Sequence, residues 1–573
     1  MDNQELAAVF ERIAALLEIK GEVVYKFLAY RRAAENLRSL SKDIRAVARE
    51  GKLQEIPGVG KAIAEKIEEL LETGELQFLK KLEKEVPPTL LELLEVPDLG
   101  PKKAALFWRE AGITTIQELE EAAKAGKLRN LPGIGEKSEQ KILEGIKAVS
   151  RRTTRMLLGM ARPIAFQWLE WLNQQDGVEK AEIAGSVRRW RETIGDLDLV
   201  AASDTPEPVM QAFVSHPDVA QVLGHGTGKS SVELKSGLRI QLWIQPARSF
   251  GSLLQYATGS QAHNVRLREH AQKKSFSLSE HGLLDKNETL LDCPTEEAVY
   301  EQIGLPWIPP ELREDRGELQ AALSGNLPAL VRLSDLRANL HTHSTWSDGK
   351  ASIEEMARAA VGHGLKTLAI TDHSQSMAIA GGLSVEELWA QKKEIDQVQK
   401  KMGDTIRLLH GIELEIRADG ELDYPDEVLA ELDIVVASLH TSLRQPREVI
   451  TRRLLGAIHN PHVDIIAHPS GRLLPDREGA DLDWEQVFKA AKETGIALEI
   501  NSHPSRLDLN DIHARRAAEM GILISVNCDA HAPDQFDTLI YGIGVARRAW
   551  ITADQVMNTW SDERLLDWLS SRK

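Results

Sequence analysis

The spacing of apolar residues changes twice along this chain, and each change predicts a different architecture. Up to about residue 150, apolar positions recur every three or four residues, as in LAAVFERIAALLEI, which is the period of amphipathic helices. Between about 155 and 245 the apolar runs are short and strand-like, as in GLRIQLWIQ, which favours an α/β segment with an antiparallel sheet. After residue 336, seven strand-like runs alternate with amphipathic stretches, which predicts a barrel of parallel strands wrapped in helices.

These changes of pattern make the protein multidomain, as a length of 573 residues also requires. The Pro-rich stretch LPWIPPELRED leads into a polar segment that suits a linker. We expect two helical regions at 1–85 and 86–150, an α/β region at 151–245, a second mixed region at 246–315, the linker at 316–336 and the barrel at 337–573.

Composition narrows the classes of protein that fit. The chain has 70 Lys and Arg against 87 Asp and Glu, and this net charge of −17 argues weakly against a protein that coats nucleic acid nonspecifically. Two cysteines exclude a disulfide framework and a cysteine-rich zinc module. Because no apolar run reaches the length of a membrane span, we expect a cytoplasmic protein with no membrane contact.

Three short segments of the helical region repeat one pattern: QEIPGVGKAIAEKI (54–67), LEVPDLGPKKAALF (94–107) and RNLPGIGEKSEQKIL (129–143). A glycine turn that opens a helix leaves backbone N–H groups free to bind an anion such as phosphate. The alternative is a capped helical hairpin that serves only for packing. The middle copy is the weakest candidate because Asp98 replaces its first glycine. The glycines that would let a phosphate approach closely are Gly58, Gly60, Gly133 and Gly135.

Histidine is concentrated in the predicted barrel, since 12 of the 17 histidines follow residue 335. Nine imidazoles and carboxylates lie at the ends of six predicted strands, where barrels of this kind carry their functional residues. They are His341, His343, Asp348, His373, Glu413, His440, His468, Asp529 and His531. Any one of these histidines could be structural, but the set predicts two or three metal ions, an arrangement that suits cleavage of phosphate esters.

The same residues lie in motifs that resemble a known family. LHTHSTWSDG, AITDHS, GIELEI, ASLH, AHPSGR and CDAH are similar to the ordered motifs of the polymerase and histidinol phosphatase (PHP) domain, over about residues 337–573. That resemblance implies a distorted seven-stranded (β/α)7 barrel with a three-metal site, occupied by Mn²⁺ or Zn²⁺.

The α/β region carries a second candidate site. Asp196 and Asp198 of GDLDLV alternate on one strand, so both carboxylates face the same way and can hold Mg²⁺ or Mn²⁺ beside a triphosphate. GSVRR (185–189) precedes them and YATGSQAHNVRLR (256–268) follows. Together these motifs resemble the α+β nucleotidyltransferase palm and the thumb of family X DNA polymerases, relatives of DNA polymerase beta. The whole chain resembles the bacterial members that carry a C-terminal PHP domain.

This resemblance implies catalytic roles for Asp196 and Asp198. The residues that would contact the incoming nucleotide are Gly185, Ser186, Arg189, Tyr256, Gly259 and Asn264.

The N-terminal repeats match helix-hairpin-helix motifs, which hold the DNA backbone without reading sequence. YKFLAYRRAA also resembles the 5′-end-binding domain of the beta enzyme, which implies DNA contacts by Lys26 and Tyr30. Lys66 falls at the Schiff-base lysine of a 5′-deoxyribose phosphate lyase. A surface lysine is the alternative, and Ala62 replaces a supporting lysine of that site.

One position departs from the family pattern. The third palm carboxylate is expected in the strand GLRIQLWIQP, where Gln241 stands instead and shares a strand face with Arg239 and Trp243. Glu233, on the preceding strand, is poorly placed to replace that carboxylate. An amide cannot neutralise a cation or accept the proton of a primer hydroxyl, so we expect a weakened catalytic metal site.

The sequence therefore predicts a DNA-repair enzyme, expected as a monomer, that acts on gapped or primer-template DNA and binds dNTPs. It would combine a weakened gap-filling polymerase with a metal-dependent 3′–5′ exonuclease. Two alternatives remain at this point: a polymerase-inactive DNA-binding module that serves mainly a PHP nuclease, and a tethered phosphatase of small molecules. The helix-hairpin-helix repeats favour the readings that involve DNA.

Overall fold

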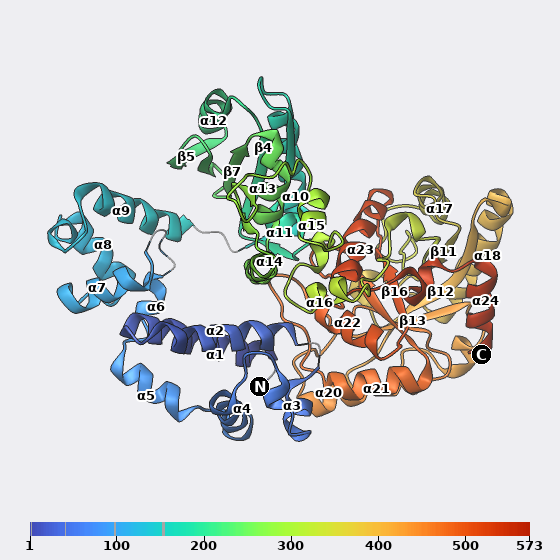
Figure 1. The fold of residues 1–573 in the computed structure, drawn as a ribbon. Helices are drawn as coiled ribbons and strands as arrows, with labels where there is room; N and C mark the ends of the chain where they lie inside the picture. Colours follow the sequence, from blue (N-terminus) through green and yellow to red (C-terminus); the bar gives the residue numbers. More distant parts are fainter. Residues whose placement is uncertain (2, 41, 95, 97–98, 152–154, 573) are drawn as a thin grey trace. The chain divides into compact units, whose positions relative to one another are not determined.

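The computed structural model describes residues 1–573 apart from residues 2, 41, 95, 97–98, 152–154 and 573 (Figure 1). The described chain forms two compact units, Met1–Thr153 and Thr154–Lys573. Among the described helices, none is both long enough and apolar enough to cross a membrane.

The first unit is built from helices, as the period of its apolar residues predicts. The α-helices are α1 (Asn3–Lys20), α2 (Val24–Ser39), α3 (Ile44–Arg49), α4 (Lys61–Thr73), α5 (Gln77–Glu85), α6 (Leu90–Leu93), α7 (Pro101–Ala111), α8 (Ile116–Lys124) and α9 (Glu136–Arg151). One hydrophobic cluster extends from Leu6 to Ile146, so both expected helical regions contribute to a shared core.

The second unit begins with a five-stranded sheet in the order β2-β4-β7-β6-β5. Its strands are β2 (Lys180–Ile183), β4 (Asp196–Ala202), β5 (Val219–His225), β6 (Lys229–Leu234) and β7 (Arg239–Gln245). The expected antiparallel sheet is wrong in one respect, because β4 and β7 run parallel. A helix, α12 (Pro206–Val214), and the β5–β6 hairpin lie between these two strands in the chain, and together they return β7 in the direction of β4.

Helices cover both faces of this sheet and lead on to the barrel. The remaining elements before the barrel are β1 (Met156–Leu157), α10 (Leu158–Asn173), α11 (Gly185–Arg188), β3 (Thr193–Ile194), α13 (Phe250–Thr258), α14 (Gln261–Lys273), β8 (Ser277–Ser279), β9 (Gly282–Leu284), α15 (Glu296–Gln302) and α16 (Glu318–Leu323). Helices α10 and α12 share one apolar cluster with the sheet. Helix α13 packs through Phe250 and Leu253 against Val200 and Ala202 of β4, on the strand face that also carries Asp196 and Asp198.

The predicted barrel is confirmed as seven strands whose paired neighbours all run parallel, in the order β10 to β16. The strands are β10 (Ala338–Asn339), β11 (Thr367–Ile370), β12 (Arg407–Glu415), β13 (Ile434–Ser438), β14 (Ile465–Ile466), β15 (Ala497–Asn501) and β16 (Ile524–Asn527). The helices are α17 (Ile353–Gly362), α18 (Val385–Met402), α19 (Asp426–Leu429), α20 (Arg447–His459), α21 (Trp484–Thr494), α22 (Asp511–Glu519), α23 (Leu539–Arg548) and α24 (Asp562–Ser571). A parallel bridge between Thr342 and Ala530 brings the first and last strands together.

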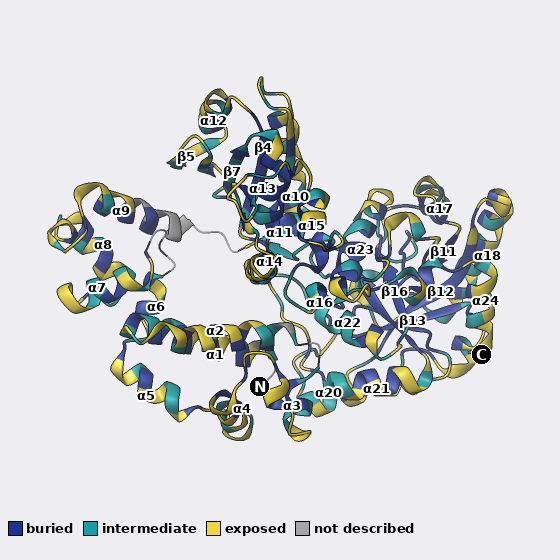
Figure 2. Cartoon of the chain, viewed as in Figure 1, coloured by how far each residue is buried: buried dark blue, intermediate teal, exposed yellow. Residues whose placement is uncertain are grey.

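The two ends of the barrel differ in the residues that line them. Inward-facing apolar residues of the strands form a cluster with Trp560, Leu565 and Leu569, so α24 and the turn before it cover one end. The strands themselves are dark blue in Figure 2, which marks them as buried. Polar residues therefore gather at the other end, where the strands finish.

Candidate functional site

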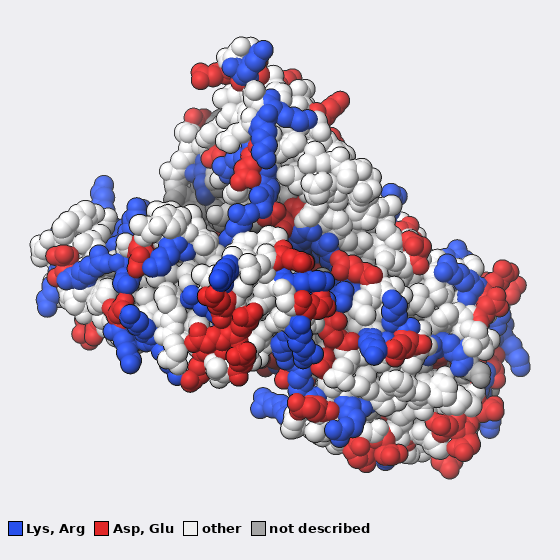
Figure 3. Space-filling model, turned by 60° about the horizontal axis from the view of Figure 1, so that its bottom comes forward, with Lys and Arg blue, Asp and Glu red and all other residues white. Residues whose placement is uncertain are grey.

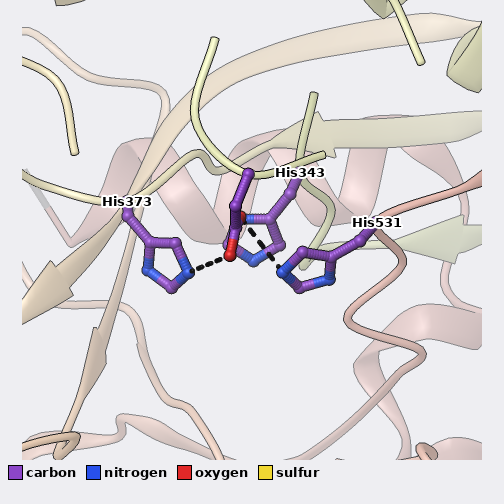
Figure 4. A group of neighbouring side chains, drawn as sticks. His343, His373 and His531 are labelled. Atoms are coloured by element: carbon purple, nitrogen blue, oxygen red, sulfur yellow. Dashed lines mark ion pairs between the residues drawn. The ribbon is translucent and has the colours of Figure 1, made fainter. Parts of the chain in front are cut away.

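All nine predicted ligands lie together at the carboxyl ends of the barrel strands. They form four overlapping groups, and within each group the ligand atoms lie within 4.8 Å of one another. The groups are His343, Asp348, His373 and His531; His341, His343 and Asp529; His341, Glu413 and His468; and His373, Glu413 and His440. Figure 4 shows the rings of His343, His373 and His531 converging on one point.

Glu413 lies at the centre of this cluster and is 1% exposed. One of its carboxylate oxygens is 2.9 Å from Nδ1 of His373, and the other is 3.0 Å from Nε2 of His468. At the edge of the cluster, Asp348 is 3.2 Å from Nε2 of His531, and Asp529 is 3.1 Å from Nε2 of His343. Each carboxylate is thus placed between imidazoles, as in a site shared by several cations.

The donor set fits divalent metal ions. Buried polar atoms without a hydrogen-bond partner are costly, and among the described residues this cluster contains several of them. They include Nε2 of His341, both ring nitrogens of His343, Nδ1 of His373, Oε2 of Glu413 and Oδ1 of Asp529. Imidazole and carboxylate groups in this combination suit zinc, manganese or iron.

The electrostatic environment differs from one ligand to the next. Burial lowers the pKa of each imidazole, but the neighbouring carboxylates outweigh burial and raise the pKa at His341, His373, His440 and His531, so these rings would release protons when metals bind. Burial alone would raise the pKa of Glu413, but the surrounding imidazoles of His440, His373 and His341 hold it well below the usual range. Burial, together with the neighbouring His373 and His531, lowers the pKa of His343 to about 3, so its imidazole is neutral at physiological pH. A neutral imidazole and an ionised carboxylate are the forms that coordinate a cation.

Two glutamates missed by the sequence analysis hold the candidate ligands in place. Oε1 of Glu499 lies 2.8 Å from Nδ1 of His341, and its Oε2 accepts a hydrogen bond of 2.7 Å from the backbone N–H of His468. Oε2 of Glu415 lies 2.9 Å from Nδ1 of His440. The sequence carried a signal for both. Glu415 follows Glu413 by two residues and shares its strand face, and Glu499 lies on the one predicted strand without an expected ligand.

Arg506, in the loop after β15, lies beside this cluster. Nε of Arg506 lies 3.7 Å from Oδ2 of Asp529, and its Nη1 is buried without a hydrogen-bond partner among the described residues. The guanidinium therefore has an N–H donor available beside the cluster, and such a donor suits an anion.

The palm carboxylates face the same way, as the alternation predicts. In the parallel pairing of β4 and β7, Asp198 lies opposite Gln241. Nε2 of Gln241 donates a hydrogen bond of 2.8 Å to Oδ2 of Asp196. Burial and the charge of Asp196 raise the pKa of Asp198 to about 7. Gly185 has a φ of +62°, and a methyl group there would clash with the Asp198 carboxylate, so glycine is required at this turn.

Arg189 joins the two predicted nucleotide motifs. Its Nη1 donates to the carbonyl of Thr258, and its Nε lies 3.2 Å from Glu314. The same Nη1 would be only 3.1 Å from a Cβ atom at Gly259. Arg189 also contributes to the electrostatic field at Asp198. The structure therefore brings Gly185, Arg189 and Gly259 together beside the palm carboxylates.

The other predicted nucleotide contacts have mainly internal partners. Nδ2 of Asn264 donates to the carbonyl of Tyr256, and its Oδ1 accepts from Gln255, both at 2.8 Å. The Tyr256 ring packs edge-on against Trp243 at 5.9 Å. Ser186 is half-buried in α11. Asn264 thus fixes the backbone of Tyr256 where the motif passes the palm sheet.

In the first unit the two glycine turns combine a positive φ angle with open space at the start of the following helix. Gly58 and Gly133 have positive φ values of 81° and 75°. The positions where a Cβ would stand at Gly60 and Gly135 are open. Gly60 precedes α4 without a side-chain cap on the N–H groups of that helix. Asp98 of the middle copy lies outside the described residues.

The predicted 5′-end residues occupy three different environments. The ring of Tyr30 stacks between Phe10 and Phe78, with centroids 5.8 and 6.0 Å away, and contributes to the core. The Lys66 ammonium donates to the carbonyl of Ala62 at 3.0 Å and lies 5.1 Å from the centre of the Phe78 ring.

Lys26 forms an ion pair of 3.2 Å with Glu22. Figure 3 shows one face of the molecule, on which both basic and acidic side chains are exposed.

Comparisons with known proteins cover nearly the whole chain. A helix-hairpin-helix domain matches residues 1–76, a SAM-like helix-hairpin-helix tandem 90–148, the DNA polymerase beta thumb 253–314 and the PHP domain 339–503. The DNA polymerase/3′-5′ exonuclease PolX of Bacillus subtilis (strain 168) is 38% identical over 98% of both chains. A protein of Thermoanaerobacter sp. (strain X514) named as a probable phosphatase is 36% identical over 38% of this chain and 89% of its own length. A Shewanella halifaxensis protein of the same name is 30% identical over 40% of this chain and 92% of its own length.

The hydrogen bond that Glu499 accepts from His341 leads to the first prediction. Changing Glu499 to Gln removes the charge that orients this imidazole, and loss of such a partner costs about 10- to 100-fold in metal affinity. The matched control is Glu493→Gln, on the exposed end of α21, where the glutamate pairs only loosely with Lys489. Isothermal titration with Mn²⁺ and with Zn²⁺ measures the difference. Equal affinities for the two variants would contradict the role given to Glu499.

Proposed function

The chain belongs to the PolX group of bacterial family X DNA polymerases with a C-terminal PHP domain, and we propose that it both extends and degrades DNA 3′ ends during repair. The observation that carries the nuclease half is the convergence of nine imidazoles and carboxylates at one end of the barrel. The polymerase half rests on the pairing of Asp196 and Asp198 beside Gly185 and on the identity to a full-length relative.

For 3′–5′ degradation, the nine residues of the barrel would hold two or three ions of Mn²⁺ or Zn²⁺. Bound metals would supply Lewis acidity and an activated water for hydrolysis of the terminal phosphodiester. Glu499 and Glu415 orient His341 and His440, so these imidazoles need no reorganisation when the substrate arrives. The available N–H of Arg506 would hold an oxygen of the phosphate, and nucleoside 5′-monophosphates would be released.

For extension, Asp196 and Asp198 would hold Mg²⁺ or Mn²⁺ beside the triphosphate of an incoming dNTP. Arg189 and the turn at Gly185 would contact the triphosphate, while Tyr256, Gly259 and Asn264 would frame the nucleotide. Gln241 brings an amide donor, rather than a third carboxylate, to the oxygen of Asp196. We therefore propose that this site binds nucleotides but transfers them slowly.

DNA would be held through the backbone N–H groups at the glycine turns of the first unit, with little dependence on sequence. Lys66 is the proposed nucleophile of a minor lyase activity, in which its amine would form a Schiff base with the sugar aldehyde. Lys26 lies on the neighbouring helix α2 and would contact the 5′ end.

Two alternative functions also have some support: a nuclease served by an inactive palm, and a phosphatase of small molecules. The first alternative is a palm that mainly presents DNA to the nuclease. The hydrogen bond that Gln241 donates to Asp196 favours it, because this amide occupies an oxygen of a candidate metal ligand. A tethered phosphatase of small molecules is favoured by the two partial relatives, which cover 38% and 40% of the chain and are named as probable phosphatases. Such an enzyme would leave the helix-hairpin-helix domains at 1–76 and 90–148 without a role.

The nuclease proposal predicts that Ala at both His341 and His343 abolishes degradation of gapped DNA, because these imidazoles serve three of the four ligand groups. Binding of gapped DNA by the full chain should change little. A matched control changes His363 and His459, two histidines outside the cluster, to Ala. Degradation of a 5′-labelled primer in Mn²⁺ measures the effect. A wild-type rate in the His341/His343 variant would exclude the barrel as the nuclease.

The DNA-binding proposal predicts that Glu at both Gly60 and Gly135 weakens binding of gapped duplex at least about tenfold, because a carboxylate would repel phosphate from the helix N-termini. The backbone at both positions tolerates a side chain, since a Cβ there meets nothing within 4 Å. The double Gly→Ala variant is the control. Fluorescence anisotropy at low and physiological salt gives the affinities, and unchanged binding by the glutamate variant would sink this assignment.

The palm proposal predicts that Gln241→Asp raises extension at least about tenfold, equivalent to ~1.4 kcal/mol of barrier. The new carboxylate would restore a metal ligand opposite Asp198. Gln245→Asp changes a residue on the same strand face and serves as the control. Single-nucleotide gap filling in Mg²⁺ measures the rate. Robust extension by the unmodified chain with no gain from the aspartate would contradict a weakened site.

A further inference from the structure

A buried arginine of the barrel reaches the nucleotide-binding turn of the palm. Arg548, at the end of α23, is 3% exposed. Its Nη1 donates a hydrogen bond of 2.7 Å to the backbone carbonyl of Arg189, 359 residues earlier in the chain. The same nitrogen lies 2.9 Å from Glu314, and Nη2 lies 2.8 Å from Asp511. Arg548 thus contacts both the turn that carries Arg189 and the glutamate that Arg189 faces.

Glu314 is shared between these two arginines. It lies 3.2 Å from Nε of Arg189, 2.9 Å from Arg548 and 4.0 Å from Arg191. Burial opposes its ionisation, yet Arg548 and Arg189 hold its pKa well below the usual range. Charges interact strongly where water is excluded. Without Arg548, the negative charge of Glu314 would be balanced chiefly by Arg189.

This balance decides how much positive charge Arg189 can offer to an anion. Arg189 lies between Glu314 and the carbonyl of Thr258, and its field reaches Asp198. With Arg548 in place, Glu314 is compensated from the barrel side, and the charge of Arg189 stays available toward the palm. The hydrogen bond to its backbone carbonyl also fixes the turn from which the side chain projects.

We propose that Arg548 of the PHP barrel is a positioning residue for nucleotide binding in the palm: it neutralises Glu314 and holds the turn of Arg189, so that Arg189 can receive the triphosphate of a dNTP. This inference rests on the proposed polymerase function. It makes the barrel part of the polymerase site, in addition to its own role in degradation.

A charge effect of Arg548 can be distinguished from a purely structural effect, because removing the charge of Glu314 should reverse only the charge effect. Arg548→Met removes the compensating charge, so the affinity for a dNTP should fall about tenfold while kcat for gap filling changes less. Adding Glu314→Gln removes the charge that would then cancel Arg189, and the double variant should recover affinity. Simple loss of packing would make the two changes additive instead. Arg548→Lys keeps the charge and should lose less than Arg548→Met.

The matched control is Arg547→Gln. Arg547 is the neighbouring residue of α23 and also crosses to the preceding part of the chain, but it pairs with Glu311 at 2.6 Å and touches neither Glu314 nor Arg189 in the described structure. Equilibrium dialysis of a radiolabelled dNTP against the full chain bound to dideoxy-terminated gapped DNA measures affinity. Degradation of single-stranded DNA by each variant reports whether the barrel is folded.

The expected result is weaker dNTP binding by Arg548→Met, recovery in the double variant with Glu314→Gln, and wild-type behaviour of Arg547→Gln. Unchanged dNTP affinity in Arg548→Met, beside normal binding by the unmodified chain, would overturn this inference alone. Absence of dNTP binding by the unmodified chain would contradict the proposed polymerase function and the inference with it. Additive losses in the double variant would also overturn the charge-balance mechanism.

Discussion

The buried charge of Glu413 is the constraint on which the barrel site depends. Five imidazoles approach its carboxylate, those of His341, His343, His373, His440 and His468, at distances from 2.9 to 3.4 Å. An ionised carboxylate so far from water needs strong compensation. The imidazoles can compensate the negative charge by taking up protons or by binding cations together with the carboxylate. The ring nitrogens of His341 and His343 that have no hydrogen-bond partner favour bound cations. The same need for compensation makes the site able to hold several metals at once.

The palm and the barrel are parts of one compact unit, and ion pairs fix how the two parts meet. Glu314 and Asp511 each lie between arginines, and Arg548 and Arg316 converge on Asp511 at 2.8 and 2.9 Å. On another face of the junction, Arg472 of the barrel pairs with Glu192 of the palm at 2.8 Å. Buried ion pairs of this kind contribute little net stability but fix geometry, because a misplaced charge would remain uncompensated. The two candidate sites, at Asp196 and Asp198 and around Glu413, are thereby held within one compact unit.

Local pattern was sufficient to predict the barrel, its seven strands and the nine candidate ligands, because parallel strands bring their carboxyl ends to one edge. It also predicted the strand face that Gln241 shares with Arg239 and Trp243, which the alternating burial of β7 confirms. Glu499 and Glu415 were missed, despite their positions on barrel strands, because they act by hydrogen bonds to candidate ligands rather than as ligands. The parallel pairing of β4 with β7 was not predicted, because it depends on how α12 and the β5–β6 hairpin turn the chain between these two strands. The contact of Arg548 with Arg189 joins residues too distant in sequence for any local pattern to connect them.

We propose that two separate metal sites in one chain act in opposite directions on the same DNA end. The most direct test of this proposal follows the length of one 5′-labelled primer on a gapped template, with and without dNTPs, in Mg²⁺ and in Mn²⁺. We expect stepwise shortening without dNTPs, and slower shortening with slow extension when dNTPs are added, most clearly in Mn²⁺. A primer that stays intact under all four conditions, or one that shortens at the same rate whether or not dNTPs are present, would contradict it.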